Sequence, residues 1–359
     1  MNIDDFHRAL FAIANEGTKA RIALPNHANI ITEYEIEQTP LFSMKTLKKY
    51  KNELYSFKGV SLSNSDDRIG IIWCFNILKV YFIDHYQTLE PVTRFGEYFI
   101  FYKEKYVITR RLKEEKQSDI IEDLHIDSII NAESIPKDIF TPINNPKISH
   151  IAEYMSSVKI IRFLPFPTCT TIQKMLVGRA VPTGGFSDEE KKKIIFVEMA
   201  ASVHYINLIF LPEVSIRFEM VFDLNIVLLE NTIENIKKYA YNPNKIGQFS
   251  KDASFVNQYI DDKDIDIAHL VHSGVNEGST NLKMLKPFHR DKYTGITTDD
   301  FMIFGYFEHI FCHEISHQLG APHTWTYTNQ QEHQQEGSGF KGMKIFLLRL
   351  TLQILRSIK

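Results

Sequence analysis

The segment from Asp300 to Leu319 carries the pattern that most restricts how this chain can fold. Its apolar residues recur at helical spacing, so that one face of a helix has to be buried. Thr297 and Asp300 are predicted to cap the start of this helix. His313 and His317 are four residues apart, and such residues project from one side of a helix one turn apart. The sequence therefore predicts a packed helix that brings two imidazoles together.

This spacing is that of two ligands of one zinc ion, and Glu314 follows the first of them. From there its carboxylate can reach a metal-bound water without entering the coordination shell. Gly320 can adopt the positive φ that ends a helix and turns the chain back. His323 can then return as a third ligand. The residues predict a Zn²⁺ site of His313, His317 and His323 with one open position.

The sequence HEISHQLGAPHTW resembles the metzincin signature HExxHxxGxxH, and its HTW ending is most similar to reprolysin-like (adamalysin-type) metalloproteases, particularly a bacterial secreted group. The resemblance continues upstream through VEMAASVHYINLIFLPEVSIRFEMV and DIDIAHLVHSG and covers the chain from about Met155. More weakly, LPNHANIITEYEIEQTPLFS and LYSFKGVSL resemble the β-rich propeptide of that group. The resemblance to these metalloproteases implies a zinc-dependent endopeptidase with a protein or peptide substrate. It also implies that Glu314 acts as the general base. An upper-rim strand between Gly274 and Leu285 would hold the substrate.

Three positions near the signature depart from the family or leave alternatives open. Ser316 stands where reprolysins usually have glycine. Met343 is the candidate for the methionine turn beneath the zinc, with an ordinary core methionine as the alternative. Glu332 or Glu336 could replace His323 as third ligand, but at less suitable spacing.

The cysteines leave a further alternative open, and two other histidines are assigned a structural role. Cys312 is predicted to be a buried thiol. A cysteine of the N-terminal part, Cys74, or Cys169 beyond it, could bind zinc and keep the enzyme latent. His269 and His272 lie on opposite faces of a predicted strand, so they form no ligand pair.

The pattern of elements predicts an α/β protein: a metzincin-like catalytic domain with a mainly parallel twisted sheet and an active-site helix, preceded by a β-rich pro-domain. Prolines between Ser134 and Ser149 mark a boundary. We expect a propeptide-like domain in residues 1–115, a linker in 116–154 and the catalytic domain in 155–359.

Individual elements follow from periodicity and caps. In the first part we expect strands at 71–83, 96–102 and 105–109 and a helix at 44–55. In the second part we expect strands at 159–166, 216–226 and 265–271, helices at 187–210 and 250–260, and a final helix at 344–359. Ser187 and Glu190 form a predicted capping box.

Composition limits the partners of the chain. Lys and Arg number 41 against 44 Asp and Glu, so the charge gives no argument for nucleic acid or an anionic membrane. The most apolar stretches are interrupted by charged residues, which predicts no membrane span. A membrane-surface helix at 344–359 is the alternative to one that packs on its own domain. The resemblance implies secretion, although no signal peptide is visible at the N-terminus.

Two other functions remain open. One is a catalytically silent zinc-bound module whose groove binds peptides. The other is a latent precursor that becomes active only after cleavage between Arg110 and Ser149. The intact Glu314 favours the enzyme over the silent module.

Overall fold

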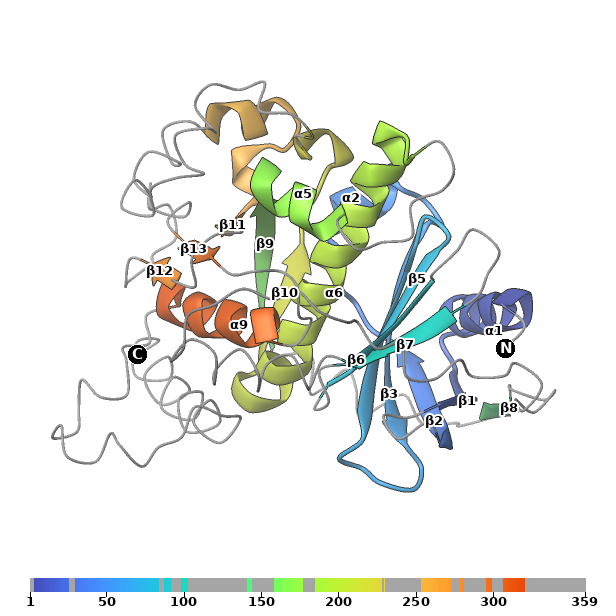
Figure 1. Cartoon of the computed structure of the whole chain (residues 1–359). Helices are drawn as coiled ribbons and strands as arrows, with labels where there is room; N and C mark the ends of the chain where they lie inside the picture. The colour runs from blue at the N-terminus through green and yellow to red at the C-terminus, as the bar shows by residue number, and fades with distance from the viewer. Residues whose placement is uncertain are drawn as a thin grey trace, which may run out of the picture.

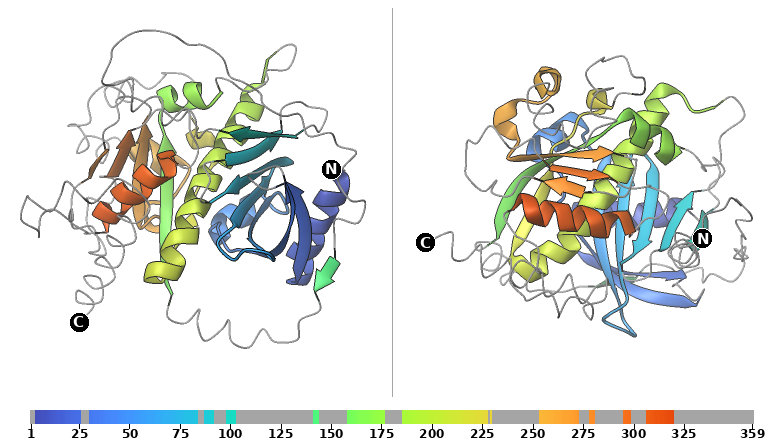
Figure 2. Two further views of the ribbon diagram at one scale, coloured as in Figure 1. Left: turned by 60° about the horizontal axis from the view of Figure 1, so that its bottom comes forward. Right: turned by 60° about the vertical axis from the view of Figure 1, so that its left-hand side comes forward.

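The structure is a computed structural model of the chain (Figure 1). It describes residues 3–25, 30–83, 87–91, 98–102, 141–143, 158–176, 185–227, 229, 253–272, 278–280, 295–298 and 306–319. In these residues the fold is mixed α/β, with two sheets on either side of one long helix (Figure 1, Figure 2).

The first sheet, here called the N-terminal sheet, is antiparallel and has the order β7-β6-β5-β4-β3-β2-β1-β8 in the part of the chain described. Its strands are β1 (Lys19–Pro25), β2 (Ile31–Gln38), β3 (Leu54–Ser61), β4 (Arg68–Cys74), β5 (Ile77–Phe82), β6 (Gln87–Pro91), β7 (Tyr98–Tyr102) and β8 (Thr141–Ile143). β8 pairs with β1, although it comes from the segment that the sequence assigned to the linker.

One face of the N-terminal sheet is covered by α1 (Ile3–Glu16), which the sequence analysis missed. Phe6, Leu10 and Ile13 recur at helical spacing and are fully buried against the sheet. The amphipathic spacing of its apolar residues is visible in the sequence.

Two predictions in this region are wrong in detail. The single strand expected at 71–83 is the hairpin of β4 and β5, because Phe75 and Asn76 both have positive φ and form a two-residue turn. The helix expected at 44–55 is the shorter α2 (Met44–Lys49), capped by Ser43, and β3 begins at Leu54.

The second sheet, here called the C-terminal sheet, has the order β10-β9-β11-β13-β12 among the described strands. Its strands are β9 (Lys159–Pro167), β10 (Ile216–Met220), β11 (Ile267–His272), β12 (Gly278–Thr280) and β13 (Gly295–Thr298). All described pairs are parallel except that of β12 with β13. This confirms the predicted mainly parallel sheet.

The long helix α6 (Asp188–Val214) lies between the two sheets (Figure 1). Its capping box of Ser187 and Glu190 is present as predicted, and the helix ends at Ser215 in the left-handed conformation. By length and composition α6 could cross a membrane, but most of it is buried inside the protein. A helix that is apolar on all sides suits a position between two sheets.

Other elements of the C-terminal part are shorter than the sequence predicted. The strand expected at 216–226 ends at Met220 and is followed by a 3₁₀ turn, η2 (Leu224–Ile226), which Asp223 caps. The helix expected at 250–260 is the 3₁₀ turn η4 (Ala253–Gln258), and η5 (Asp262–Asp264) follows. Cys169–Leu176 form α5, which the sequence did not predict.

Candidate active site

The predicted active-site helix is α9 (Tyr306–Gln318). It lies beside β12, β13 and α6. Phe311 is fully buried and packs on Phe307 and on Phe163 of β9. The apolar face predicted from periodicity therefore fixes α9 on the C-terminal sheet.

The expected capping pair of Thr297 and Asp300 is wrong for Thr297. This residue belongs to β13, and its hydroxyl is hydrogen-bonded to His269 of β11 at 2.8 Å. Ser or Thr before an apolar helix suggests a cap in sequence, but here the hydroxyl serves a contact between neighbouring strands.

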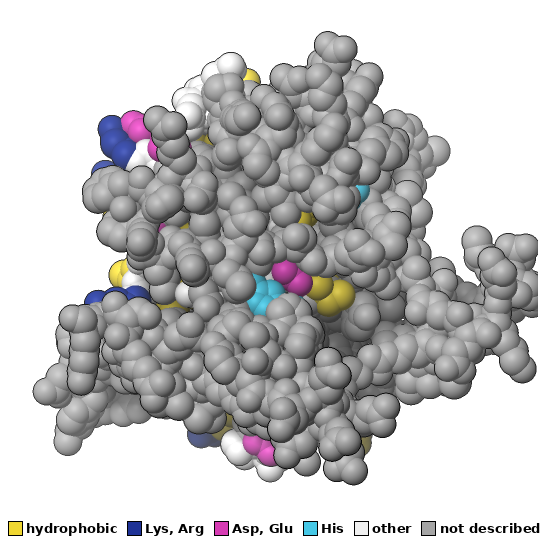
Figure 3. All heavy atoms as spheres, turned by 90° about the vertical axis from the view of Figure 1, so that its left-hand side faces the viewer, with side chains coloured by type: hydrophobic (Ala, Val, Ile, Leu, Met, Phe, Trp, Pro, Cys, Tyr) yellow, Lys and Arg dark blue, Asp and Glu magenta, His cyan; other side chains and the backbone are white. Residues whose placement is uncertain are grey.

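His313 and His317 face each other on α9. Their Nε2 atoms are 2.9 Å apart, and the two rings are nearly perpendicular. His317 is buried, whereas His313 is partly exposed. Figure 3 shows histidine and acidic side chains next to each other at the surface on the side of the molecule where α9 lies. The sequence prediction that the two imidazoles meet is confirmed.

The histidine pair suits a zinc ion. Two nitrogens of a tetrahedral site lie about 3.3 Å apart when each is about 2.0–2.1 Å from the metal. The observed 2.9 Å is within a few tenths of an ångström of that separation, so a small movement of the rings makes room for the ion. Imidazole nitrogens are also the ligands that zinc prefers in such sites.

Glu314 lies between the two histidines in sequence and is buried. Burial raises the pKa of its carboxyl to about 7, because the charged form loses its hydration. A carboxyl with a near-neutral pKa can both accept and donate a proton near pH 7.

Ser316 and Cys312 complete the buried side of α9. The Ser316 hydroxyl donates to the Cys312 carbonyl at 2.7 Å, so the polar group that replaces the usual glycine has a partner within the helix. Cys312 is fully buried, and burial raises the pKa of its thiol well above its usual value. The prediction of a buried core thiol is confirmed.

The end of α9 is fixed by a residue that the sequence analysis missed. Gln318 directly follows His317, its Oε1 atom lies 2.8 Å from Nδ1 of His269, and its Nε2 donates to the Ala268 carbonyl at 3.0 Å. A side chain added at Gly295 would overlap His269 and Gln318. Gln318 and Gly295 thus position the turn that carries His317, and no pattern in the sequence marks them for that role.

A second polar contact connects α9 to α6. Glu308 is almost fully buried, and its Oε1 accepts a 2.7 Å hydrogen bond from the Ser202 hydroxyl.

His269 and His272, which were predicted to be structural, have different partners. His269 is hydrogen-bonded to Gln318 and Thr297, and His272 is hydrogen-bonded to Thr168 at 3.0 Å. Cys74 lies in β4 and donates to the Tyr55 carbonyl at 3.9 Å.

Several predicted residues lie outside the described residues, and their placement stays a prediction. They are Gly320, His323, Glu332, Glu336 and Met343. The strand expected at 105–109 and the helix expected at 344–359 also lie there. Among the described residues, no group of three or more His, Cys, Asp or Glu could hold a metal ion.

Comparison with known proteins supports the predicted resemblance to reprolysin-like metalloproteases. Residues 196–324 match the family model described as metallo-peptidase family M12B, reprolysin-like. The match spans about a third of the chain, from within α6 to just beyond His323, and ends before Met343. No curated protein matches the chain. The part of the chain that carries α9 is therefore similar to the reprolysin-like M12B metallopeptidases.

Proposed function

We propose that the chain is a zinc-dependent endopeptidase that hydrolyses internal bonds of proteins or peptides. The observation that carries the proposal is the His313–His317 pair on α9, with Nε2 atoms 2.9 Å apart. The family match over residues 196–324 supports it. The resemblance to secreted enzymes adds the proposal that the protein acts outside the cell.

In this proposal His313, His317 and His323 hold the zinc ion, and Gly320 ends the helix so that the chain returns. A bound zinc ion would polarise the scissile carbonyl and lower the pKa of a bound water to about 7. Glu314 takes the proton of the attacking water and passes it to the leaving amine. Its buried carboxyl supports this role, because a pKa of about 7 permits both transfers. Met343 is the proposed methionine of the turn below the site.

The substrate would bind along β12. This strand is at the edge of the C-terminal sheet among the described strands, and it runs antiparallel to β13. It lies beside α9 and within the range 274–285 expected for the upper-rim strand. An extended peptide that pairs with this edge adds one strand to the sheet and passes next to the histidine pair.

The experiment compares three variants of the full chain after loading with zinc. Glu314→Gln is expected to retain zinc and to lose peptide hydrolysis by at least about a thousandfold. His317→Ala is expected to lose both. Glu53→Gln, an exposed glutamate of the N-terminal part, is the matched control and should behave like the parent. The measurements are zinc content after gel filtration and cleavage of casein with and without a chelator.

Two outcomes would contradict the enzyme. Full hydrolysis by Glu314→Gln would show that this carboxyl is not the base. A parent protein that holds zinc and binds casein without cutting it would favour the silent binding module.

A further inference from the structure

We propose that the N-terminal sheet is a permanent part of the peptidase body, which stays bound to α6 and β10 after the chain between the two sheets is cut. The partner of the surface formed by α6 and β10 is the chain's own N-terminal part, which carries α2 and the N-terminal sheet. The proposal concerns the association of two parts of the chain and does not depend on zinc or hydrolysis.

The first support is a shared aromatic core. Phe196 of α6 contacts Phe42, Tyr50 and Phe75 from the N-terminal part and Phe222 from the C-terminal part. The ring centroids are 5.1–5.9 Å apart. These residues belong to one continuous hydrophobic cluster that includes the core of the C-terminal sheet. Separation of the two parts would therefore expose the centre of a core and not merely a surface.

The second support is a buried ion pair. Lys79 of β5 lies 2.7 Å from Glu198 of α6, and only 4% and 12% of the two side chains are exposed. Lys79 is directed to this face because its neighbours Leu78 and Val80 face α1. Separation would part the two charges, and loss of one of them would remove a close opposite charge from the other, which is buried.

The third support is a buried histidine on α6. His204 is hydrogen-bonded through Nε2 to the Thr39 hydroxyl at 2.8 Å and through Nδ1 to the Tyr81 hydroxyl at 2.7 Å. Burial lowers its pKa to about 3, so the ring is neutral and each nitrogen needs one partner. A side chain at Gly70 would overlap the Tyr81 ring, so this glycine lets Tyr81 lie across β4 and reach His204.

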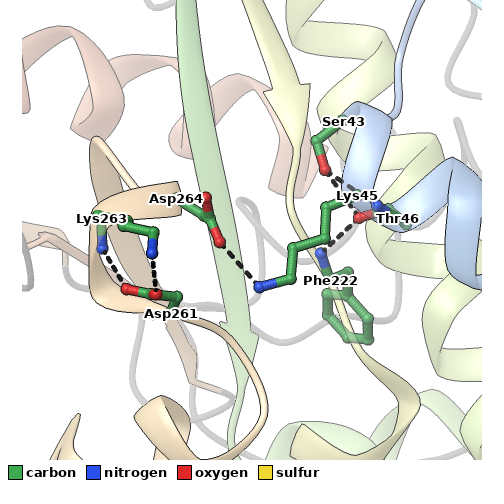
Figure 4. A network of polar contacts seen from close by, with 7 residues as sticks. All are labelled: Ser43, Lys45, Thr46, Phe222, Asp261, Lys263 and Asp264. Atoms are coloured by element: carbon green, nitrogen blue, oxygen red, sulfur yellow. Dashed lines mark hydrogen bonds and ion pairs between the residues drawn. The ribbon is translucent and has the colours of Figure 1, made fainter.

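The fourth support is the backbone at the edge of the C-terminal sheet. Phe42 forms a parallel bridge with Met220, whose N–H donates to the Leu41 carbonyl and whose carbonyl accepts from Ser43. Figure 4 shows the adjacent side chains: Thr46 accepts from the Phe222 N–H. The edge of β10 is thus completed by the N-terminal part, as an edge strand requires.

Charged contacts at the rim add to this edge. Lys45 lies 2.8 Å from Asp264 of η5 (Figure 4), and Lys49 is paired with Asp223. The Tyr50 hydroxyl accepts from the Leu224 N–H at 2.9 Å. These contacts and the preceding ones are made with α6, β10, η2 and η5, and α6 in turn contacts α9. The contacts of the N-terminal part with α6 thus belong to the scaffold on which α9 lies.

The test cuts the full folded chain at a specific protease site inserted between His150 and Ile151. Cutting there leaves β8 with the rest of the N-terminal sheet, so that the halves are joined by non-covalent contacts such as those described above. We expect both halves to elute together from gel filtration in native buffer and to separate in denaturant, with complete cutting shown on a denaturing gel. Halves that separate in native buffer would overturn the proposal.

Variants locate the contact that holds the halves. Lys79→Met is expected to raise the dissociation constant of the cut halves at least tenfold, and Lys79→Met with Glu198→Met to recover most of that loss. Lys45→Met, at a more exposed pair, is the matched control and should change the constant by less than about threefold. The double variant also serves if Lys79→Met alone does not fold. Equal constants for Lys79→Met and Lys45→Met would contradict the proposed interface.

Discussion

Two buried histidines, one on α6 and one in β11, have the same kind of hydrogen-bond network but connect different parts of the molecule. His204 and His269 are both buried, and both ring nitrogens of each are hydrogen-bonded to side chains. Each contact also has a glycine beside it, Gly70 in one case and Gly295 in the other, where any side chain would overlap the network.

The two histidines differ in the elements that their hydrogen bonds connect. His204 joins the N-terminal sheet to α6 through Thr39 and Tyr81. His269 joins β11 to Gln318, the residue directly after the candidate ligand His317. One network should therefore control the cohesion of the protein, and the other should also control the position of the histidine pair.

The largest expected effect is loss of stability in acid. Burial lowers the pKa of His204 to about 3 and that of His269 to about 4, each below the usual 6.5. The unfolded chain binds these protons first, so stability is fully present above about pH 6.5 and falls as the pH drops toward the folded pKa values. Each pH unit between folded and unfolded pKa is about 1.4 kcal/mol per histidine. Urea unfolding of the zinc-free protein at about pH 7.5 and about pH 5 measures this loss.

Glutamine variants separate the two contributions. His204→Gln and His269→Gln keep an amide for hydrogen bonding and remove the titration, so each should reduce the acid loss. A double variant that loses as much stability between the two pH values as the parent would contradict the assignment. His204→Gln should leave zinc affinity unchanged, whereas His269→Gln should lower it.

The sequence predicted the candidate metal-binding histidines better than the residues that position them. The four-residue spacing of His313 and His317 fixes their meeting on any helix, so the pair follows from local geometry alone. Gln318 and Gly295 were not predicted because their neighbours lie in other elements, far from them in the chain. Contacts of this kind depend on the packed sheet and leave no periodic signal.

In the fold, too, features with a local sequence signal were predicted and others were not. The capping box at Ser187 and the strand expected at 159–166, which is β9, were predicted because their signals are local. The division of 71–83 into two strands depended on positive φ at Phe75 and Asn76, and Phe is not a usual residue of such a turn. The burial of Lys79 could not be predicted either, because its partner Glu198 lies on α6, more than a hundred residues later in the chain.

The next largest effect is expected from Gln318→Leu. This change leaves His269 Nδ1 and the Ala268 carbonyl without their hydrogen bonds, at about 1–3 kcal/mol for each buried group. We expect zinc affinity to fall about tenfold or more, because the turn that carries His317 loses its anchor. Competition with a coloured chelator measures the affinity. Gln173→Leu, on the exposed face of α5, is the control. Unchanged affinity would show that Gln318 does not position the pair.

Alanine at the two glycines gives a closer comparison. Neither Gly70 nor Gly295 has a positive φ, so the cost of alanine comes from overlap with Tyr81 in one case and with His269 and Gln318 in the other. Both variants should lose about 1–3 kcal/mol of unfolding free energy. Only Gly295→Ala should weaken zinc binding, and only Gly70→Ala should weaken the association of the cut halves. The comparison fails if both variants change both properties equally.

The smallest effect is expected where a polar contact is well formed but exposed. The guanidinium of Arg162 of β9 makes two hydrogen bonds to Asp266, at 2.6 and 3.0 Å, and the Arg162 N–H makes a third at 2.8 Å. Both side chains are 40% exposed. Water competes for both groups, so Asp266→Asn should lower the unfolding free energy by less than about 1 kcal/mol and should leave zinc affinity unchanged. The geometry of this pair is no worse than that of His204 or His269. A loss as large as that of Gln318→Leu would therefore mean that hydrogen-bond geometry, and not burial, decides which polar contacts hold the two halves and the candidate site in place.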